Sequence, residues 1–318
     1  MSISERPLVS VLIPCFNAGR WIGQTIESVV TQTWPNIEII VVDDGSSDDS
    51  VAVVQRFDCR QIKLINQKNA GAATARNRAF KESSGEYIQY LDADDLLSPR
   101  KIELQMARLV ENPRCVASAE WARFTRDPAE ATFLSDETWL DLEPVEWLVR
   151  AWRDGGGMLY PALWLVPRQV MLNAGPWLPE LSLNDDGELF TRVILASEKV
   201  LFCEGSRTYY RSGISGSLSG LKSREGWESQ FKVIDLCQGY LLAREDSERT
   251  HRVCSMLWQR FALAAYPYCR SLANEALRRA RALHSVELVP DGGRLFHVVT
   301  LIAGWKVARI LQRASGRP

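Results

Sequence analysis

The chain has 318 residues, enough for one large domain or for one domain with a smaller appendage. With 46% hydrophobic and 24% charged residues, its composition is that of an ordinary globular protein and excludes a disordered or fibrous one. The formal net charge of −1 gives no support to a general nucleic-acid-binding role, so we expect no nucleic-acid partner.

The first hundred residues alternate short β-branched runs with segments of helical spacing. The expected strands are 9–13, 37–42, 62–65 and 87–91, and the expected helices are 21–31, 50–57, 70–81 and 99–110. This order predicts an α/β fold with a mostly parallel sheet and helices on both faces.

Shorter elements follow in the middle of the chain. Strands are expected at 115–119, 199–203 and 208–210, an extended segment at 159–166, and helices at 144–152, 168–173 and 189–196. After Gly220 the pattern becomes helical, with helices expected at 225–243, 248–269, 271–285 and 294–312. We therefore expect two domains, an α/β domain over 1–220 and a helical C-terminal region over 221–318.

The seven cysteines and the N-terminus bear on the cellular compartment. The cysteines are odd in number and form no C-x-x-C pair, which argues against a disulfide framework and against a zinc knuckle. Residues 1–7 lack the apolar run of a signal peptide, and no stretch reaches the length of a membrane span. The expected location is the cytoplasm.

Acidic residues gather where the predicted strands end. Asp43 and Asp44 follow the second strand, and Asp92, Asp94 and Asp95 follow the fourth. In such sheets ligands bind beyond the carboxyl ends of the strands. Each cluster alone could be only a turn or a helix cap, but two clusters at one sheet edge favour a ligand site.

The Asp-x-Asp pair formed by Asp92 and Asp94 is a set of hard oxygen donors, which suits Mn²⁺ or Mg²⁺ held together with substrate phosphates. The sequence contains no G-x-x-x-x-G-K-[ST] and no G-x-G-x-x-G segment, so a metal rather than a glycine-rich loop would hold the phosphates.

Four segments in order carry a family resemblance: VSVLIPCFN at 9–17, IIVVDDGSSD at 39–48, NAGAATARN at 69–77 and GEYIQYLDADD at 85–95. Residues 8–110 resemble the family 2 glycosyltransferases, which have the GT-A fold and invert the anomeric centre. The resemblance is moderate over 175–219 and poor over the C-terminal helices.

The resemblance implies roles for residues of the nucleotide half. Pro14 and Phe16 would flank the base, Asp44 would accept from a uracil ring, and Arg76 would lie near the nucleotide. Asp94 would be the metal ligand.

The resemblance also implies a role for Asp92, in contacting the ribose or a metal-bound water. The family's catalytic base lies in a later acidic pair that opens a helix, which points to Asp186 as the base. Its neighbour Asp185 stands where the family usually has Glu, and Trp177 and Asp185 are candidate acceptor contacts. In the alternative interpretation, the acidic pair only charges a helix N-terminus.

The loop after 208–210 departs from the family, because Ser212 stands where family members often have His. The loop over 212–217 is still expected to close over the diphosphate, with Arg211 and hydroxyl groups as donors.

The segment 294–312 combines many apolar residues with Lys306 and Arg309, and Arg313 follows it. It either lies on an anionic membrane surface at the inner face of the membrane or packs on the protein's own core. The membrane interpretation makes a lipid-linked acceptor plausible.

Together these observations predict an inverting, metal-dependent glycosyltransferase with Mn²⁺ or Mg²⁺ as cofactor. It would transfer a sugar from a nucleotide diphosphate sugar, with UDP favoured, to a glycan or lipid-linked acceptor in cell-surface polysaccharide or glycoconjugate synthesis. The alternatives are a non-catalytic nucleotide-sugar-binding protein, an Asp-x-Asp phosphatase of the haloacid dehalogenase type, and a nucleotidyltransferase.

Overall fold

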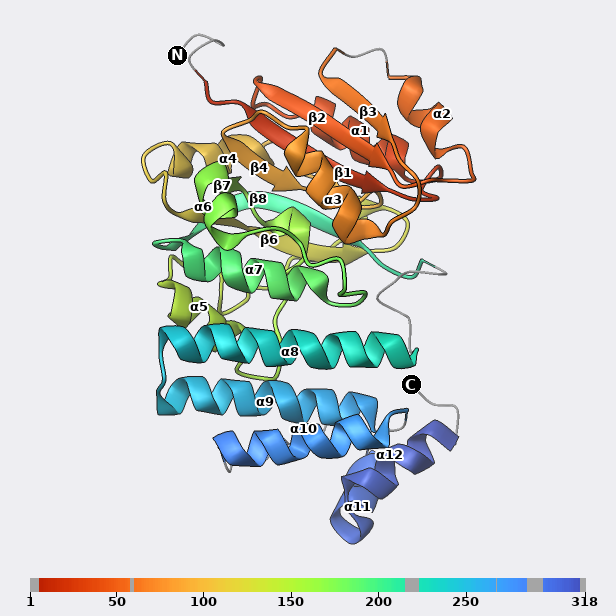
Figure 1. Cartoon of the computed structure of the whole chain (residues 1–318), viewed down its shortest axis with the longest axis vertical. Helices are drawn as coiled ribbons and strands as arrows, with labels where there is room; N and C mark the ends of the chain where they lie inside the picture. The colour runs from red at the N-terminus through yellow and green to blue at the C-terminus, as the bar shows by residue number, and fades with distance from the viewer. Residues whose placement is uncertain (1–5, 58–59, 215–222, 267, 285–293, 315–318) are drawn as a thin grey trace. The chain divides into compact units, whose positions relative to one another are not determined.

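The computed structural model describes residues 6–57, 60–214, 223–266, 268–284 and 294–314 (Figure 1). The chain forms two compact units. Unit 1 comprises Met1–Trp147, Leu159–Glu180 and Asp185–Ser217, and unit 2 comprises Leu148–Met158, Leu181–Asn184 and Leu218–Pro318. The domain boundary expected at residue 220 lies outside the described residues and stays a prediction.

Unit 1 is built on a five-stranded sheet with the strand order β3-β2-β1-β4-β7. Its strands are β1 (Val9–Cys15), β2 (Ile37–Asp43), β3 (Ile62–Asn66), β4 (Tyr87–Tyr90) and β7 (Val166–Pro167). The strands β1 to β4 pair in parallel, whereas β7 runs antiparallel to β4. The mostly parallel α/β sheet predicted from the sequence is confirmed.

Helices connect these strands, as the alternating pattern predicted. They are α1 (Ile22–Val30), α2 (Ser50–Gln55), α3 (Ala72–Lys81) and α4 (Lys101–Leu109). In Figure 1, α3 lies in front of the sheet and α1 lies behind it. The central strands β1 and β2 are buried along almost their whole length, which is why they consist almost entirely of apolar and β-branched residues.

A second sheet of three strands has the order β5-β8-β6. It comprises β5 (Leu96–Leu97), β6 (Val116–Phe124) and β8 (Val200–Arg211). The sequence predicted two strands at 199–203 and 208–210, and this was wrong because β8 continues through both. The pairing of β6 with β8 shifts register between Ala119 and Glu120, and Gly205 opposite them has a φ of 74° that glycine adopts without strain.

The region between the sheets also differs in part from expectation. The segment 159–166 was predicted to be extended, but it contains a turn of 3₁₀ helix, η3 (Pro161–Leu163), before β7. Proline at the first position of this turn supplies the helical φ. The helices α5 (Pro144–Ala151) and α6 (Arg168–Ala174) follow the prediction closely, whereas α7 (Asp185–Ala196) begins before the expected 189, at the acidic pair itself. The 3₁₀ turn η2 (Pro128–Glu130) precedes all three.

Unit 2 contains the helices α8 (Arg224–Arg244), α9 (Glu248–Ala265) and α10 (Arg270–Leu283). Aromatic side chains hold α8 on α9, since Phe231 lies 4.7 Å from Trp258 and 5.6 Å from Phe261, measured between ring centroids. Arg279 of α10 pairs with Asp235 of α8 and lies over the Phe231 and Trp258 rings.

The helix expected over 294–312 is divided into α11 (Arg294–Ala303) and α12 (Trp305–Ala314). Gly304 separates them with a φ of 80°, which a helix cannot continue through. Within the part of the chain that the structure describes, no helix is both long and apolar enough to cross a membrane.

Candidate active site

The carboxyl end of β1 carries the residues predicted to flank a base. Pro14 is half-buried within β1, and the Phe16 ring just beyond it is exposed. Asn17 has a φ of 48°, and its Oδ1 accepts a hydrogen bond of 2.8 Å from the backbone N–H of Ser47. This contact joins the turn after β1 to the turn after β2. The exposed Phe16 ring is available to a ligand, and its role stays a prediction.

Asp44 is buried and fully engaged with the loop that leads into α3. Its carboxylate accepts hydrogen bonds from Gln67 Nε2 at 2.7 Å and from the backbone N–H groups of Ala70 and Gly71 at 2.9 and 2.8 Å. The predicted uracil contact would have to use the lone pairs that these three donors leave. The structure therefore gives Asp44 a role in holding the 67–71 loop, and its role toward a base stays a prediction.

Asp92, Asp94 and Asp95 lie in the loop after β4, at the same edge of the sheet. Two hydrogen bonds from Thr25 Oγ1, to the carbonyl oxygens of Ala93 and Asp95 at 2.9 and 3.0 Å, tie this loop to α1. The Thr25 hydroxyl thus holds the backbone of this loop, and the carboxylates are positioned in the absence of a ligand.

The electrostatics of this loop suit a cation. Burial and the neighbouring Asp92 raise the pKa of Asp94 to about 6, and burial with Asp94 raises the pKa of Asp95 well above its usual range. No described side chain donates to the Asp94 carboxylate. A divalent cation would relieve this repulsion, so the residues present fit Mn²⁺ or Mg²⁺.

The protein would supply only part of such a coordination shell. Among the described residues, no group of three or more His, Cys, Asp or Glu side chains is arranged to hold a metal. Oxygen atoms of a diphosphate and of water would complete the shell, as is usual for Mg²⁺.

Arg211 was expected to contact a diphosphate, but it lies in a structural position. Its backbone N–H donates to Asp95 Oδ1 and its Nε donates to the Asp94 carbonyl oxygen, both at 2.8 Å. Its guanidinium also lies 4.4 Å from the centroid of the Trp21 ring. Arg211 thus secures the Asp-x-Asp loop to the end of β8. The rest of the expected 212–217 loop lies largely outside the described residues.

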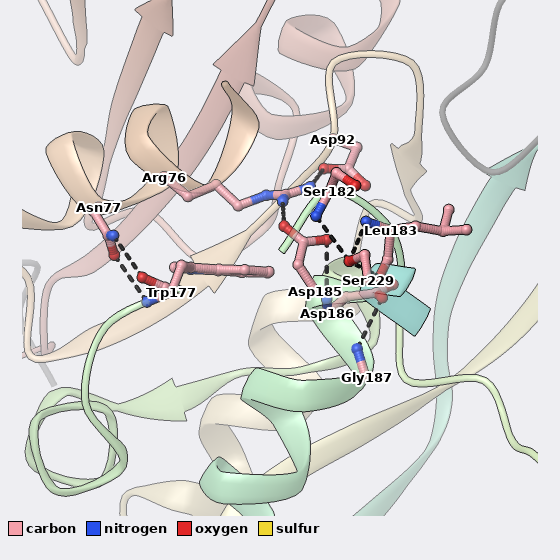
Figure 2. A network of polar contacts seen from close by, with 10 residues as sticks. All are labelled: Arg76, Asn77, Asp92, Trp177, Ser182, Leu183, Asp185, Asp186, Gly187 and Ser229. Atoms are coloured by element: carbon pink, nitrogen blue, oxygen red, sulfur yellow. Dashed lines mark hydrogen bonds and ion pairs between the residues drawn. The ribbon is translucent and has the colours of Figure 1, made fainter. Parts of the chain in front are cut away.

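The acidic pair at the start of α7 joins the Asp-x-Asp loop through Arg76 (Figure 2). Arg76 Nη1 lies 2.9 Å from Asp185 Oδ2, and Arg76 Nη2 lies 2.8 Å from Asp92 Oδ1. One guanidinium group therefore brings together the two acidic motifs, which are far apart in the sequence. This is the main geometric feature of the site.

Asp186 has the environment of a general base. Burial and the adjacent Asp185 carboxylate raise its pKa to about 6, while a hydrogen bond of 2.8 Å from the Gly187 N–H to Oδ1 acts in the opposite direction. A base with a pKa close to the operating pH combines ionisation with a useful proton affinity.

Trp177 does not offer an open aromatic face, since the residue is 1% exposed. Its ring lies below Arg76, with the guanidinium carbon 4.3 Å from the ring centroid. This burial argues against the acceptor contact predicted from the sequence, and it indicates a structural role under Arg76.

Asn77 was given no role from the sequence, and Asp95 was placed in the acidic cluster without its contact to Arg211. Asn77 exchanges two hydrogen bonds of 2.9 Å with the backbone of Trp177, and Asp95 accepts from Arg211. Both lie inside the motif segments 69–77 and 85–95, but their partners are distant in sequence, so no local signal reveals the contacts.

The parallel sheet, with its acidic loops at the carboxyl ends of the strands, defines an α/β protein of the GT-A class. The chain belongs to glycosyl transferase family 2, whose family model matches residues 10–168.

Individual proteins agree with this assignment. The glycosyltransferase YibD of Escherichia coli K12 is 39% identical over 117 residues, covering 36% of this chain and 34% of YibD. WfgD of Escherichia coli, named a UDP-Glc:α-D-GlcNAc-diphosphoundecaprenol β-1,3-glucosyltransferase, is 42% identical over 106 residues, covering 33% of this chain and 42% of WfgD. The chain thus matches less than half the length of these relatives.

A solved structure shares the fold over nearly the whole chain. Residues 1–349 of Staphylococcus aureus TarS, in complex with UDP-GlcNAc, superpose with a TM-score of 0.72 at 17% identity, covering 98% of this chain and 92% of that one. At this level of identity the similarity demonstrates the fold.

Proposed function

We propose that the chain is an inverting, metal-dependent glycosyltransferase that moves a sugar from a UDP-sugar to a glycan or lipid-linked acceptor. The observation that carries the proposal is the ion-pair bridge from Asp92 through Arg76 to Asp185, because it joins a cation-suited carboxylate loop to a buried candidate base.

In this proposal the two acidic motifs divide the chemistry. Asp186 Oδ2 takes the proton from the acceptor hydroxyl as that oxygen attacks the anomeric carbon and the bond to the diphosphate breaks. Asp94, with Asp92 beside it, would hold Mn²⁺ or Mg²⁺, which stabilises the negative charge of the departing diphosphate. Arg211 and Thr25 hold the Asp-x-Asp loop in place throughout.

The relatives guide the choice of substrates. WfgD is named for UDP-glucose and for an acceptor linked to diphosphoundecaprenol, and TarS was solved with UDP-GlcNAc. We therefore propose UDP-glucose and UDP-GlcNAc as the first donors to test, with an acceptor sugar carried on a polyprenyl diphosphate.

A lipid-linked acceptor requires contact with a membrane, and unit 2 carries a surface suited to it. Leu301 and Ile302, next to the break at Gly304, are 87% and 81% exposed. Residues 294–314 contain four Arg or Lys and no acidic residue. We propose that this surface of α11 and α12 binds the anionic inner face of the membrane peripherally.

Calorimetry tests the catalytic proposal. The purified chain is titrated with UDP, GDP and TDP, each with and without Mn²⁺. We expect Mn²⁺-dependent binding of UDP, and we expect Asp94→Ala to abolish the metal dependence because the proposed metal ligand is lost. If the folded chain binds none of the three nucleotides, the glycosyltransferase proposal fails and the Asp-x-Asp phosphatase alternative gains support.

A further inference from the structure

The guanidinium group of Arg76 is enclosed by protein. Its terminal nitrogens donate to Asp185 and Asp92, its side chain is 8% exposed, and its buried Nε finds no hydrogen-bond partner among the described residues. A group intended to contact a nucleotide directly would instead turn its donors toward open space. The enclosure indicates that Arg76 serves its carboxylate partners.

The face of the Trp177 ring packs against this guanidinium, and the ring is itself held by other aromatic side chains. Its ring stands edge-on to Tyr90 at 5.2 Å and to Phe190 at 6.0 Å between centroids, while Arg76 lies 4.3 Å from it. A cation over the face of a tryptophan is attracted by the ring, most strongly when water is excluded. The Trp177 ring therefore favours one position and one orientation of the Arg76 guanidinium.

The segment that carries Trp177 is itself held from two helices. The side-chain amide of Asn77, the residue after Arg76 on α3, exchanges two hydrogen bonds with the backbone of Trp177. Arg192 of α7 donates from Nη2 to the Pro176 carbonyl oxygen at 2.9 Å. The Trp177 ring, the Arg76 guanidinium and the acidic pair at the start of α7 are thus connected through α3 and α7.

Hydrogen bonds connect Arg76 through Asp185 to the candidate base Asp186. Asp185 accepts from Arg76 at Oδ2 and from the Asp186 N–H at Oδ1, the latter at 3.1 Å, so both of its oxygens are held. Asp186 in turn is held at Oδ1 by the Gly187 N–H, and its Oδ2 makes no hydrogen bond to a described residue. The unengaged oxygen is thereby fixed in direction.

We propose that Arg76 is a positioning residue, which holds Asp185 and Asp92 together over the Trp177 ring and so aims Oδ2 of Asp186 at the attacking hydroxyl. This inference rests on the proposed function. It assigns Arg76 to the chemical step and not to nucleotide affinity.

The charges around Asp186 add a second consequence. Asp185 and Asp92 raise the pKa of Asp186, and Arg76 lowers it. Replacing Arg76 by a neutral residue therefore raises that pKa further. Because Asp186 acts only when ionised, the acidic limb of the activity profile moves to higher pH.

The test measures release of UDP as sugar is transferred from UDP-glucose or UDP-GlcNAc to an acceptor sugar carried on a polyprenyl diphosphate, in the presence of Mn²⁺. UDP affinity is measured in parallel by calorimetry. The variants are Arg76→Lys, Arg76→Gln and Asp185→Glu. The matched control is Arg78→Lys, because Arg78 is exposed two residues further along the same helix. Asp185→Glu keeps the pairing charge and reproduces the usual family residue.

We expect Arg76→Gln to lower kcat on the order of 100-fold, the typical cost of a misplaced catalytic group, with KM and UDP affinity near wild type. Its acidic limb should lie at higher pH. Arg76→Lys and Asp185→Glu, which keep the pairing charge, should retain intermediate rates, and Arg78→Lys should resemble wild type. A raised KM at unchanged kcat in Arg76→Gln would overturn the inference while leaving the proposed function intact. Failure of wild type and Arg78→Lys to release UDP would instead overturn the proposed function, and the inference with it.

Discussion

Asp186 is surrounded by opposing charges, and its behaviour follows from their balance. Burial and Asp185 raise its pKa to about 6, so the carboxylate is ionised at neutral pH and becomes protonated as the pH falls. Activity should therefore fall below about pH 6 in the wild type if Asp186 is the base.

Replacing this residue separates binding from chemistry. Asp186→Asn keeps the volume of the side chain but cannot accept the proton. The rate of transfer should fall on the order of 100- to 10,000-fold while UDP binding by calorimetry is retained. Asp154→Asn, at an exposed position, serves as the control. Near wild-type transfer by Asp186→Asn would show that another group is the base.

At the residue scale, the sequence identified which side chains gather, but not what each one touches. Asp92, Arg76 and Asp185 were all predicted for the site from motif segments. Their ion pairs depend on α3 approaching both the loop after β4 and the start of α7, which no local pattern encodes. Likewise, the burial of Trp177 beneath Arg76 is a tertiary property, and the sequence alone favoured a solvent-facing aromatic.

At the scale of single elements, the start of β4 is packed too tightly to accept a larger side chain at Gly85. Gly85 precedes β4, and its N–H donates to Ser10 Oγ at 2.8 Å and to Glu38 Oε1 at 2.9 Å. A Cβ at this position would lie 2.7 Å from the Ser10 backbone nitrogen and 2.8 Å from the Leu8 carbonyl oxygen. Because these are backbone atoms of the central strand region, they cannot move aside easily.

Gly85→Ala should therefore destabilise the protein by about 1–3 kcal/mol, the usual effect of overpacking. Gly239→Ala is the matched substitution, since Gly239 lies inside α8 and an added Cβ meets no atom within 4 Å. It should stabilise by about 0.5–1 kcal/mol, because alanine favours the helix. Urea denaturation of both variants checks the prediction, and equal shifts of the same sign would contradict it.

The helices were predictable because their apolar residues recur with the helical period, and the parallel strands because they are short apolar, β-branched runs. The short β5 was not, because two residues, Leu96 and Leu97, carry no period. The continuity of β8 was hidden by Gly205, which normally signals a break but here permits a bulge. Gly304 has the opposite effect, since it ends a helix within a continuous apolar pattern.

At the scale of the whole molecule, the chain does not divide at one point. Unit 2 includes residues 148–158 and 181–184 in addition to its C-terminal helices. Ser229 of α8 shows why, since its Oγ accepts from the backbone N–H groups of Ser182 and Leu183 at 2.9 and 3.1 Å. A sequence pattern reveals where the composition changes. It does not reveal that short segments such as 148–158 and 181–184 pack with helices far along the chain.

Membrane binding is a prediction at this scale. The double variant Leu301→Gln, Ile302→Gln should sediment less with phosphatidylglycerol vesicles. We expect binding weaker by about tenfold or more, since burying one such side chain contributes about 1.5–3 kcal/mol. Salt should weaken wild-type binding, because the basic residues act through screened charges.

Leu134→Gln is the control for that experiment, because Leu134 is 74% exposed and belongs to unit 1. Equal binding of all variants to phosphatidylglycerol and phosphatidylcholine vesicles would contradict the proposal. Self-association in sedimentation velocity that the double variant abolishes would instead identify a second copy as the occupant of this surface.

The three hydrogen bonds of Asp44 have a consequence for redesign of the protein. They fasten the turn after β2 to the start of α3, and five residues after Gly71 the same helix carries Arg76. Changes made to alter donor preference near Asp44 would thus be transmitted to the rate as well. When segments are swapped between homologues, the turn after β2, the 67–71 loop and α3 should therefore be transferred together.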